Sequence, residues 1–493
     1  MRIDNDKPRC HCGVVGFYGS PDASVNTYYA LHALQHRGQE ASGIVTKSIN
    51  EKGHSIFNIH RGEGLVSEVF SNPKVLKEKL IGSSAIGHNR YSTTGSSESA
   101  KNIQPFYVNY RLGNLAIAHN GNLTNATELR KKLVAEGSIF QTTSDTEVVL
   151  HLIAKSKLND QVEQVKEALS FIEGSYCFVI LMDDKIIAAR DPYGFRPLAL
   201  GNLNGSFVVA SETCAFDILE ANFIREIEPG ELIVIDDKAI AEQKVKSYRI
   251  FEKTYPKSHC VFEHIYFSRP DSFIFGHNVD KMRRRLGKAL AKNHPVRDKD
   301  GEKLIVISVP DSSNTTALGY QKQIEKDGIL SKLEIGLIRS HYIGRTFIQP
   351  GQAKREIGVR IKFNTVKGVL EGRTVVIVDD SIVRGTTSKQ LVNLIREAKP
   401  KAIHLRISSP PIKFPCFYGM DFPSKEELIA NKCHGVIEEI KDYLEVDSLE
   451  YLTIDEMLDA VSEGNVGNFC SACFSGNYPC KIDTSFTKDI YEL

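Results

Sequence analysis

The chain has 493 residues, of which 41% are hydrophobic and 25% are charged, and its formal net charge is +1. At roughly 150 residues per domain, this length predicts two to four domains, each able to bury its own core. A near-neutral chain gives no sign of a nucleic-acid partner. Because no apolar run is long enough to span a bilayer and Met1–His11 lacks the apolar core of a secretory signal, we expect a cytoplasmic protein without membrane contacts.

The first half of the chain reads as short strands separated by turns, with a few helices. Alternating apolar residues and frequent Gly and Asn favour a largely antiparallel architecture with helices packed on it. The predicted strands are Cys12–Tyr18, Ala85–His88, Leu115–His119, Tyr176–Met182, Ile186–Arg190, Phe207–Ala210 and Glu231–Ile235, and the predicted helices are Thr146–Lys155 and Gln161–Phe171.

The second half has a different character. The stretch Lys238–Lys257 is polar and rich in lysine, which is typical of a connection between domains. Beyond it, Leu304–Ile307 and Val375–Val378 are fully apolar runs, each followed by an acidic turn and a helical pattern. Such strands indicate a parallel sheet with helices on both faces, and ligands bind beyond the carboxyl ends of its strands.

The turn after Val378 carries the most informative motif, Asp379-Asp380-Ser381-Ile382-Val383-Arg384-Gly385-Thr386-Thr387. Adjacent carboxylates at a strand end suit ribose hydroxyls and a hard cation such as Mg²⁺. Backbone amides at a helix N-terminus suit a phosphate. The alternative is a solvated Asp-Asp turn with a Ser/Thr helix cap.

Together with its apolar strand, this motif resembles the PRPP-binding (phosphoribosyl pyrophosphate) motif of type I phosphoribosyltransferases. The resemblance implies a Mg²⁺ site at Ser312, Asp379 and Asp380. It also implies a PRPP site formed by Asp379, Asp380, Ser381, Arg384, Gly385, Thr386 and Thr387.

The segment Tyr342–Pro350 resembles the loop that covers pyrophosphate in amidophosphoribosyltransferases, and it places Arg345 among the PRPP ligands. In that family the residues before the tyrosine are usually Lys-Asn-Arg, whereas here they are Arg339-Ser340-His341. The positive charge at the first position is kept, and the other pyrophosphate contacts differ.

Several motifs near the start of the chain point to a second kind of chemistry. Alone, Cys12-Gly13 at a strand start is better explained by a buried cysteine. It is followed in order by Gln35-His36-Arg37-Gly38-Gln39-Glu40, Gly87-His88-Asn89-Arg90-Tyr91-Ser92-Thr93, His119-Asn120-Gly121-Asn122-Leu123 and Ser144-Asp145-Thr146-Glu147. This set resembles the class II glutamine amidotransferase domain of the N-terminal-nucleophile hydrolases.

The resemblance implies that Cys12 is the nucleophile and that its own α-amine is the base. Asn120 and the amide of Gly121 would form the oxyanion hole, Arg90 would bind the glutamine carboxylate, and Asp145 its ammonium group. A free α-amine requires removal of residues 1–11 as a propeptide. Cys10 is a rival nucleophile, but Gly13 after Cys12, not His11 after Cys10, fits the Cys-Gly start of the family motif. An ordinary ion pair remains the alternative for Arg90 and Asp145.

Ten cysteines in a chain without a signal peptide favour metal binding or catalysis over disulfides. Cys177 and Cys214 are expected to be small core residues, and Cys470-Ser471-Ala472-Cys473 could be a redox dithiol. The surroundings of Cys260, Cys416, Cys470 and Cys473 resemble the iron–sulfur branch of the amidophosphoribosyltransferases, in which four such cysteines bind one 4Fe-4S cluster. Spacing alone also permits zinc. Cys433 and Cys480 match no ligand position.

The resemblance to that family extends from Cys12 to about Pro479. It implies an α+β N-terminal-nucleophile hydrolase domain at 12–248 and an α/β type I phosphoribosyltransferase domain with a cluster-binding extension at 249–493. The implied reaction makes 5-phosphoribosylamine from PRPP and glutamine, the first committed step of purine synthesis. The family also implies a homotetramer inhibited by purine nucleotides. Two rival hypotheses are a nucleotide-sensing regulator with a vestigial glutaminase and an amidotransferase acting on another acceptor.

Overall fold

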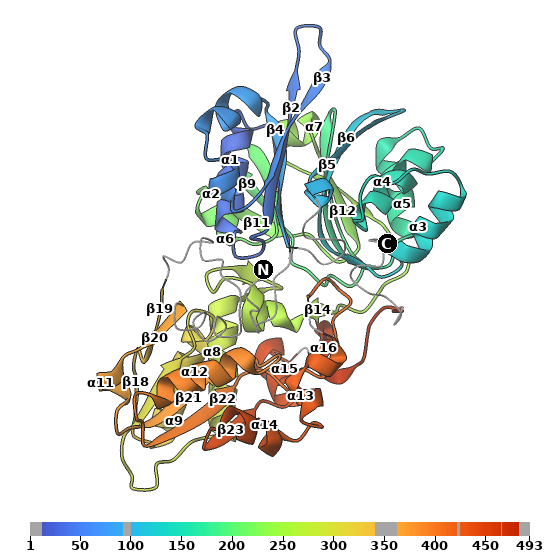
Figure 1. Cartoon of the computed structure of the whole chain (residues 1–493). Coiled ribbons are helices and arrows are strands. Elements are labelled where there is room, and N and C mark those ends of the chain that lie inside the picture. Colours follow the sequence, from blue (N-terminus) through green and yellow to red (C-terminus); the bar gives the residue numbers. More distant parts are fainter. Residues whose placement is uncertain (1–11, 92–99, 341–361, 422–423, 465, 483–493) are drawn as a thin grey trace.

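The computed structural model describes residues 12–91, 100–340, 362–421, 424–464 and 466–482. These residues form two units, one above the other in Figure 1. The upper unit is built from the first half of the chain and the lower unit from the second half, as the colours from blue to red show.

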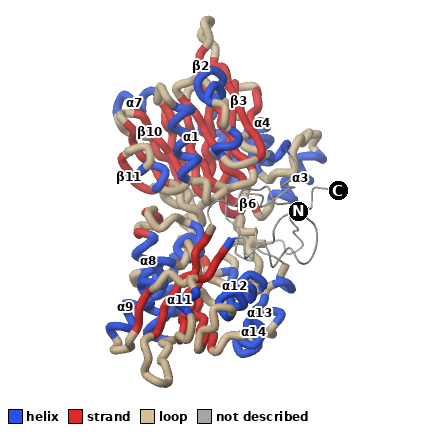
Figure 2. The backbone as a smooth tube through the Cα atoms, turned by 60° about the vertical axis from the view of Figure 1, so that its left-hand side comes forward, coloured by secondary structure: helices blue, strands red, loops and turns tan. Residues whose placement is uncertain are grey.

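The upper unit contains two antiparallel sheets that pack face to face. Figure 2 shows their strands in red in the upper part of the molecule. The seven-stranded sheet has the order β11 (Asn222–Glu226), β9 (Ala199–Leu203), β10 (Ser206–Ala210), β1 (Gly13–Tyr18), β4 (Ser84–Arg90), β2 (Ala41–Ile49) and β3 (Ser55–Glu63). The six-stranded sheet has the order β13 (Lys246–Arg249), β12 (Glu231–Asp236), β8 (Lys185–Arg190), β7 (Gly174–Met182), β6 (Gly113–Leu123) and β5 (Phe106–Tyr110).

Helices cover the outer face of each sheet of the upper unit. Helices α1 (Ala23–Ala33), α2 (Val66–Val69) and α6 (Cys214–Asp217) pack on the seven-stranded sheet. Helices α3 (Ala126–Ala135), α4 (Thr146–Lys155) and α5 (Gln161–Ser170) pack on the six-stranded sheet. The four layers confirm the predicted antiparallel architecture.

The central strands of the upper unit are apolar on both faces because each face lies against a core. Along β7, Phe178 and Ile180 pack toward α3–α5, whereas Cys177 and Val179 pack toward the other sheet. This alternation follows from the two-residue period of a strand. It explains why a strand of an antiparallel sheet reads as a continuous apolar run, and it confirms Cys177 as a core residue.

The lower unit is built on a five-stranded parallel sheet with the order β18 (Ser331–Leu333), β17 (Leu304–Ser308), β21 (Thr374–Asp379), β22 (Ala402–Ile407) and β23 (Ser448–Tyr451). One face is covered by α8 (Val279–Asn293), α9 (Asn314–Lys326) and α15 (Ile454–Ser462). The other face is covered by α12 (Thr386–Arg396), α13 (Ile429–Lys432) and α14 (Ile437–Leu444). The predicted parallel sheet with helices on both faces is therefore confirmed.

Short elements complete the lower unit around this sheet. They are β14 (His259–Cys260), which pairs in parallel with β24 (Phe469–Cys470); β15 (Phe273–Ile274) with β16 (His277–Asn278); β19 (Leu337–Arg339) with β20 (Phe363–Thr365); α11 (Lys367–Leu370) and α16 (Ala472–Ser475). The β14–β24 pair joins the junction between the units to the end of the chain.

The interpretation of residues 238–257 as a connection is wrong for its first half. Helix α7 (Asp237–Glu242) and strand β13 lie there, and β13 pairs with β12 at the edge of the six-stranded sheet. Lys238 and Lys246 face solvent from these two elements, and so the polar composition of this part did not mark a loop. Apart from the short turn between α7 and β13, the irregular chain of this stretch lies between β13 and β14.

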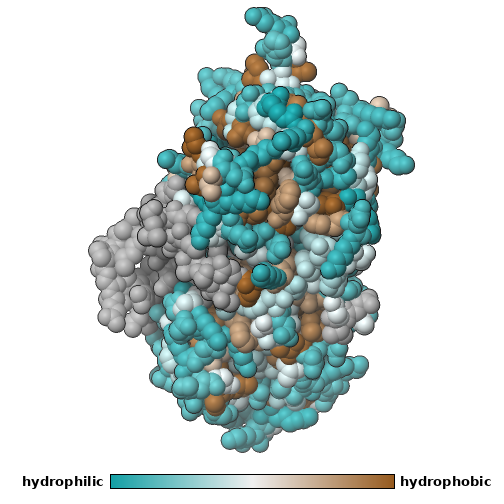
Figure 3. All heavy atoms as spheres, turned by 90° about the vertical axis from the view of Figure 1, so that its right-hand side faces the viewer, coloured by the Kyte–Doolittle hydropathy of each residue, from teal (hydrophilic) through white to brown (hydrophobic). Residues whose placement is uncertain are grey.

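Within the described ranges, no helix is both long enough and apolar enough to cross a membrane. Figure 3 shows one face of the molecule, on which hydrophilic residues predominate and apolar residues lie in scattered groups.

Candidate active sites

Cys12 lies immediately before β1, and pairing of β1 with β4 brings it to the end of β4. Its thiol lies 3.4 Å from the carbonyl oxygen of Tyr91 and accepts from the Tyr91 amide at 3.5 Å. Burial raises the pKa of the thiol to about 11, and the Tyr91 backbone and the Arg90 charge only partly offset that effect. A thiol with this pKa is protonated at neutral pH, so nucleophilic attack requires a base.

Asn120 and Gly121 lie on β6, on the facing sheet. A hydrogen bond of 3.0 Å from His88 Nε2 to the His119 carbonyl ties β6 to β4. The Asn120 side chain is completely buried, and neither Oδ1 nor Nδ2 has a hydrogen-bond partner among the described residues. An unpaired buried amide is costly and rare, which is typical of a group kept for a ligand.

Gly121 is required by the close approach of β6 and β7. A Cβ atom there would lie 2.0 Å from the carbonyl oxygen of Ser175, the residue paired with Asn122 on β7. Only glycine fits, and the Asn120-Gly121 backbone is therefore held against the neighbouring strand.

Asp145 precedes α4 and is 4% exposed. It accepts a hydrogen bond of 2.9 Å from the Leu123 amide, and its other oxygen lies 3.7 Å from His119 Nδ1. Burial alone would raise the pKa of this carboxyl, but the charge of His119 and the hydrogen bonds outweigh it, and the pKa lies below its ordinary value. Asp145 is therefore an anion near neutral pH.

Arg90 is the last residue of β4 and is also buried, at 4% exposure. The positive charge of Arg90 lowers the pKa of the Cys12 thiol and the negative charge of Asp145 raises it. A thiol, a buried cation, a buried anion and an unpaired amide thus converge at one end of the two sheets. This cluster could hold the two charged groups of an amino acid while its side chain is attacked.

The second candidate site lies at the carboxyl ends of β17 and β21, which are neighbours in the parallel sheet. Asp379 and Asp380 are buried, at 3% and 0% exposure. Ser313 Oγ donates to Asp379 at 3.0 Å, and the Ser312 hydroxyl donates to Asp380. The alternative of a solvated Asp-Asp turn is wrong, because the turn is buried and fixed by serines from the neighbouring strand's loop.

Helix α12 begins directly after this turn. Gly385 precedes it with φ +80°, and a Cβ atom there would lie 2.2 Å from Ile429 Cδ1. The first amides of α12 therefore open onto the same end of the sheet as Asp379 and Asp380. Arg384 Nε donates to Glu427 Oε1 at 3.3 Å. Arg345 lies outside the described residues.

The four predicted ligand cysteines meet in one buried cavity. The pairing of β14 with β24 sets Cys260 beside Cys470. The same cavity is lined by Cys416, Cys473 and Arg196. Its lining does not include Cys433 or Cys480. Burial raises the pKa of the Cys260 thiol to about 11 and also raises the pKa of the other three.

The cavity brings four thiols together, and four thiolates are the donor set that both a zinc ion and a cubane cluster accept. In the described part of the chain, no three His, Cys, Asp or Glu side chains lie close enough together to hold a single metal ion. A zinc ion needs four thiolates at about 2.3 Å, whereas a cubane cluster holds its thiolates farther apart.

The two units meet through buried charges that the sequence did not predict. Four charged side chains, all 0% exposed, form a network at the seam between the units. Three come from the upper unit and one from the lower: Arg37, Arg196 and Glu212, with Glu263. Arg37 Nη2 donates to Glu263 Oε1 at 2.8 Å and Nη1 to Glu263 Oε2 at 3.0 Å. Two cations and two anions compensate one another, which a buried ion network requires.

The loop that carries Cys416 also crosses this seam. Asn122 Nδ2, two residues beyond Asn120, donates to the Phe417 carbonyl at 3.0 Å. Arg196 donates to the Tyr418 carbonyl at 2.8 Å. The cysteine cavity therefore abuts the oxyanion strand.

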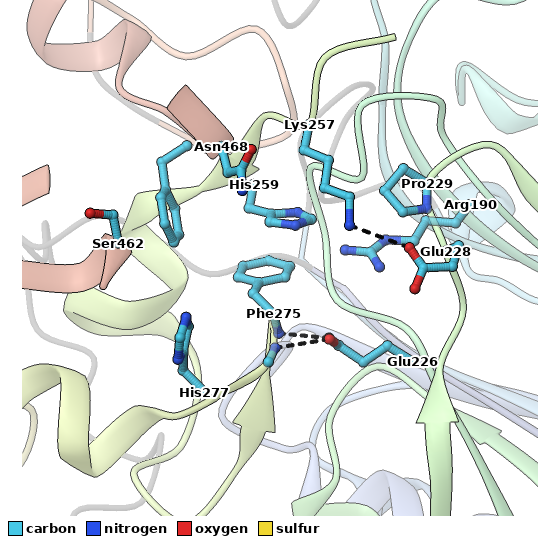
Figure 4. Close-up of a pocket in the computed structure, with 12 residues that line it drawn as sticks. Arg190, Glu226, Glu228, Pro229, Lys257, His259, Phe275, His277, Ser462 and Asn468 are labelled. Atoms are coloured by element: carbon cyan, nitrogen blue, oxygen red, sulfur yellow. Dashed lines mark hydrogen bonds and ion pairs between the residues drawn. The ribbon is translucent and has the colours of Figure 1, made fainter. Parts of the chain in front are cut away.

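A further pocket at the seam is drawn in Figure 4, and neither candidate site contributes to its lining. The amides of Phe275 and Gly276 donate to Glu226, and the rings of Phe275 and His259 stack 4.3 Å apart. Lys257 faces Glu228 at 3.5 Å on the outer side. These contacts join the two units behind the β14–β24 pair.

Comparison with known proteins decides the family. A model of the glutamine amidotransferase domain matches residues 88–217. Amidophosphoribosyltransferase 1, chloroplastic, of Arabidopsis thaliana is 50% identical over 479 residues, covering 97% of this chain and 80% of that protein. The Bacillus subtilis amidophosphoribosyltransferase is 47% identical, covering 96% of this chain and 94% of that protein. The chain belongs to the amidophosphoribosyltransferase family.

Solved structures agree over both units. A structure described as the allosteric regulatory enzyme of purine biosynthesis is 45% identical and superposes with a TM-score of 0.87, covering 96% of this chain and 97% of that one. The B. subtilis glutamine PRPP amidotransferase in complex with ADP and GMP gives a TM-score of 0.86 at 45% identity, covering 97% of this chain and 99% of that one. The predicted fold class of both units is confirmed.

Proposed function

We propose that the chain converts PRPP, glutamine and water to 5-phosphoribosylamine, glutamate and pyrophosphate, the first committed step of purine synthesis. One observation carries this proposal: a single chain of this family holds a buried thiol beside an unpaired amide and a buried Asp-Asp turn before a helix N-terminus. Neither rival hypothesis accounts for both sites. A regulator needs no nucleophile, and an amidotransferase for another acceptor needs no phosphoribosyl turn.

The glutaminase half begins at Cys12. Arg90 binds the glutamine carboxylate and Asp145 its ammonium group, so the carboxamide is presented to the thiol. As the thiol attacks, its proton passes to the α-amine of Cys12, and Asn120 Nδ2 and the Gly121 amide stabilise the oxyanion. Ammonia leaves as the acyl-enzyme forms, and water releases glutamate.

An α-amine on Cys12 requires that residues 1–11 are removed as a propeptide. Such an amine has a free pKa of roughly 7.7–8.0, so near neutral pH it can accept the thiol proton. The buried Cys12 thiol requires such a base, because its pKa of about 11 keeps it protonated near neutral pH. We propose 12–248 as the glutaminase domain and 249–493 as the phosphoribosyltransferase domain with its extension.

The synthase half lies at Asp379 and Asp380. Their carboxylates bind the ribose hydroxyls, while Ser381 and the amides and hydroxyls from Arg384 to Thr387 hold the 5-phosphate. Mg²⁺, held by Ser312, Asp379 and Asp380, would supply charge stabilisation for the departing pyrophosphate. Arg345 is proposed as a further pyrophosphate ligand. Ammonia from Cys12 passes inside the protein to the ribose carbon.

Cys260, Cys416, Cys470 and Cys473 are proposed to hold one 4Fe-4S cluster with a structural role. A cluster ligated from the junction, from the loop after β22 and from the chain's end would stabilise the fold when all three segments are in place. Neither half-reaction is a redox step, and so the reaction itself requires no electron transfer.

The proposed protein is a cytoplasmic homotetramer inhibited by purine nucleotides. The ADP and GMP complex of the B. subtilis relative supports nucleotide binding. The plant relatives are chloroplastic by name, so the compartment differs among related proteins.

Two variants test the division into two sites. Cys12→Ala, in a chain that begins at residue 12, should lose glutamine-dependent synthesis and keep synthesis from concentrated free ammonia. Asp380→Asn should lose both, because Asp380 acts on PRPP itself. Loss of the ammonia-dependent reaction in well-folded Cys12→Ala would contradict the division, and so would an Asp380→Asn enzyme that still makes the product.

A further inference from the structure

Arg37 is bonded at both ends of its guanidinium. Its Nε donates to the main-chain carbonyl of Cys12 at 3.3 Å, and its two terminal nitrogens donate to the carboxylate of Glu263. Glu263 belongs to the lower unit, in the segment that follows β14. The residue that bears the nucleophile is thus held, through one arginine, by a carboxylate of the other catalytic half.

The chain of hydrogen bonds continues from Glu263 to the phosphoribosyl turn. Ser268 Oγ donates to Glu263 at 2.6 Å. Arg283 donates to the Ser268 carbonyl at 2.8 Å and to the Ser312 carbonyl at 3.4 Å. The Ser312 hydroxyl in turn donates to Asp380.

The side chains of this route are buried, except that of Ser312, which is partly exposed. Arg37 and Glu263 are 0% exposed, and Ser268 and Arg283 are each 1% exposed. Water cannot replace a contact that is lost in such a place, and the bidentate Arg37–Glu263 pair fixes direction as well as distance. A shift of the Ser312 turn therefore has a contiguous physical path to the backbone of Cys12.

We propose that Glu263, with Arg37 and Arg283, is a positioning residue for the glutaminase nucleophile, so that the state of the Ser312–Asp380 turn sets the placement of Cys12. This inference rests on the proposed function and assigns part of the glutaminase machinery to the phosphoribosyltransferase half. Arg90 and Asp145 are not on the route. Disturbing it should therefore slow attack by the thiol without weakening glutamine binding.

The chain offers a matched control with the same chemistry. Arg225 donates to both oxygens of Glu231 at 2.8 and 2.7 Å, and Ser247 Oγ donates to Glu231 at 2.6 Å. This Arg–Glu–Ser set repeats the bonding of Arg37, Glu263 and Ser268, but Arg225 and Ser247 are partly open to solvent and belong to the upper unit alone.

The experiment compares Glu263→Gln and Ser268→Ala with Glu231→Gln and Ser247→Ala in the full-length enzyme. We expect the first two to lower kcat for glutamine about 10- to 100-fold, the loss that a displacement of about 1 Å causes at a reacting group. KM for glutamine and the ammonia-dependent rate should stay within about twofold, since neither depends on the placement of Cys12. By the same route, saturating PRPP should change the glutaminase rate of the wild type more than that of these two variants. The control variants should match the wild type in every measurement.

The outcomes separate this inference from the proposed function. A wild-type enzyme that uses neither glutamine nor ammonia with PRPP would refute the function itself. If wild type is active and Ser268→Ala equals Ser247→Ala in kcat for glutamine and in its response to PRPP, the route is wrong. Equal losses of the glutamine and ammonia reactions would also overturn it, because they indicate a structural defect. Should Glu263→Gln fail to fold, Ser268→Ala, which removes only one hydroxyl, decides.

Discussion

Asn120 and Asn89 provide a paired test of the oxyanion assignment. Both side chains are 0% exposed, but their bonding is opposite. Asn89 Nδ2 donates to the Leu31 carbonyl at 2.7 Å, and its Oδ1 accepts from Ser42 Oγ at 2.9 Å. Neither polar atom of the Asn120 side chain has a partner within the described residues. Replacing each by Ala therefore removes the same atoms from two different bonding states.

The expected stabilities follow from that difference. Asn89→Ala removes two hydrogen bonds and leaves two buried groups unpaired, which costs roughly 2–4 kcal/mol. Asn120→Ala removes an amide whose burial without partners costs about 1–3 kcal/mol, and this gain offsets the lost packing, so stability should stay within about 1 kcal/mol of wild type. For a unit of this size, about 1 kcal/mol shifts Tm by roughly 2–4 °C. Asn89→Ala should thus melt roughly 4–16 °C below wild type, whereas Asn120→Ala should melt within about 4 °C of it.

Glutamine-dependent activity should show the opposite order, with the greater loss in Asn120→Ala. Losing one oxyanion donor costs about 10²- to 10³-fold in kcat, and so Asn120→Ala should be nearly inactive with glutamine although it is well folded. Ammonia-dependent synthesis should persist. The test is to measure Tm of both variants, together with their glutamine-dependent and ammonia-dependent rates of synthesis at 25 °C. An Asn120→Ala protein that melts as low as Asn89→Ala, or that keeps wild-type kcat for glutamine, would refute the reasoning.

Three further predictions concern the chain's start, the cysteine cavity and the seam. Active enzyme should begin at Cys12 by N-terminal sequencing and intact mass, and full glutamine-dependent activity in chains that still begin at Met1 would contradict the proposed base. Anaerobically purified protein should be brown, with equal iron and sulfide; Cys473→Ser should lose iron and Cys433→Ser should not, whereas colourless protein with one tightly bound zinc would exclude the cluster. The pKa of Glu263 lies below its ordinary value of 4.5, because Arg37 and Arg196 outweigh the effect of burial, so its contribution to stability is present above pH 4.5 and is lost as pH falls through the lowered value. Tm measured from pH 6 to pH 3 should fall more steeply for wild type than for Glu263→Gln, and parallel curves would show that this carboxylate does not carry the effect.

Much of the fold could be predicted because its elements have strong local patterns. Helix α4 begins and ends where its periodicity predicts, at Thr146 and Lys155. The strand that ends in Asp379 was equally plain, since it is apolar along its length and stops at two carboxylates. In both cases the burial pattern is written within about ten consecutive residues.

Other elements left no such pattern. The buried residues of α1 are mainly small or weakly apolar, including Ala23, Ser24, Thr27 and Ala30, so the helix shows little contrast between its faces. The hairpin of β2 and β3, which projects from the top of the upper unit in Figure 1, was also not predicted. Its strands mix polar and apolar residues because much of β3 is partly exposed.

The candidate sites divide in the same way. Motif residues such as Cys12 and Asp380 could be predicted because each motif is contiguous. The seam network could not, since Arg37 and Glu263 lie 226 positions apart and nothing in either segment specifies its partner. Long-range ionic pairing is fixed by the docking of whole units, which no local pattern records.

The β14–β24 pair also determines how late in synthesis the junction between the units can form. Cys260 on the junction strand pairs with Cys470, which the ribosome adds 210 residues later. At about 5–20 residues per second, that interval lasts roughly 10–40 s. Throughout it, β13, the last strand of the upper unit, has been made while the junction strand still lacks its neighbour. Assembly of this protein therefore ends with a closing step at the junction, and any ribosome that stops before Phe469 releases a chain whose two halves are joined by sequence but not by this ladder.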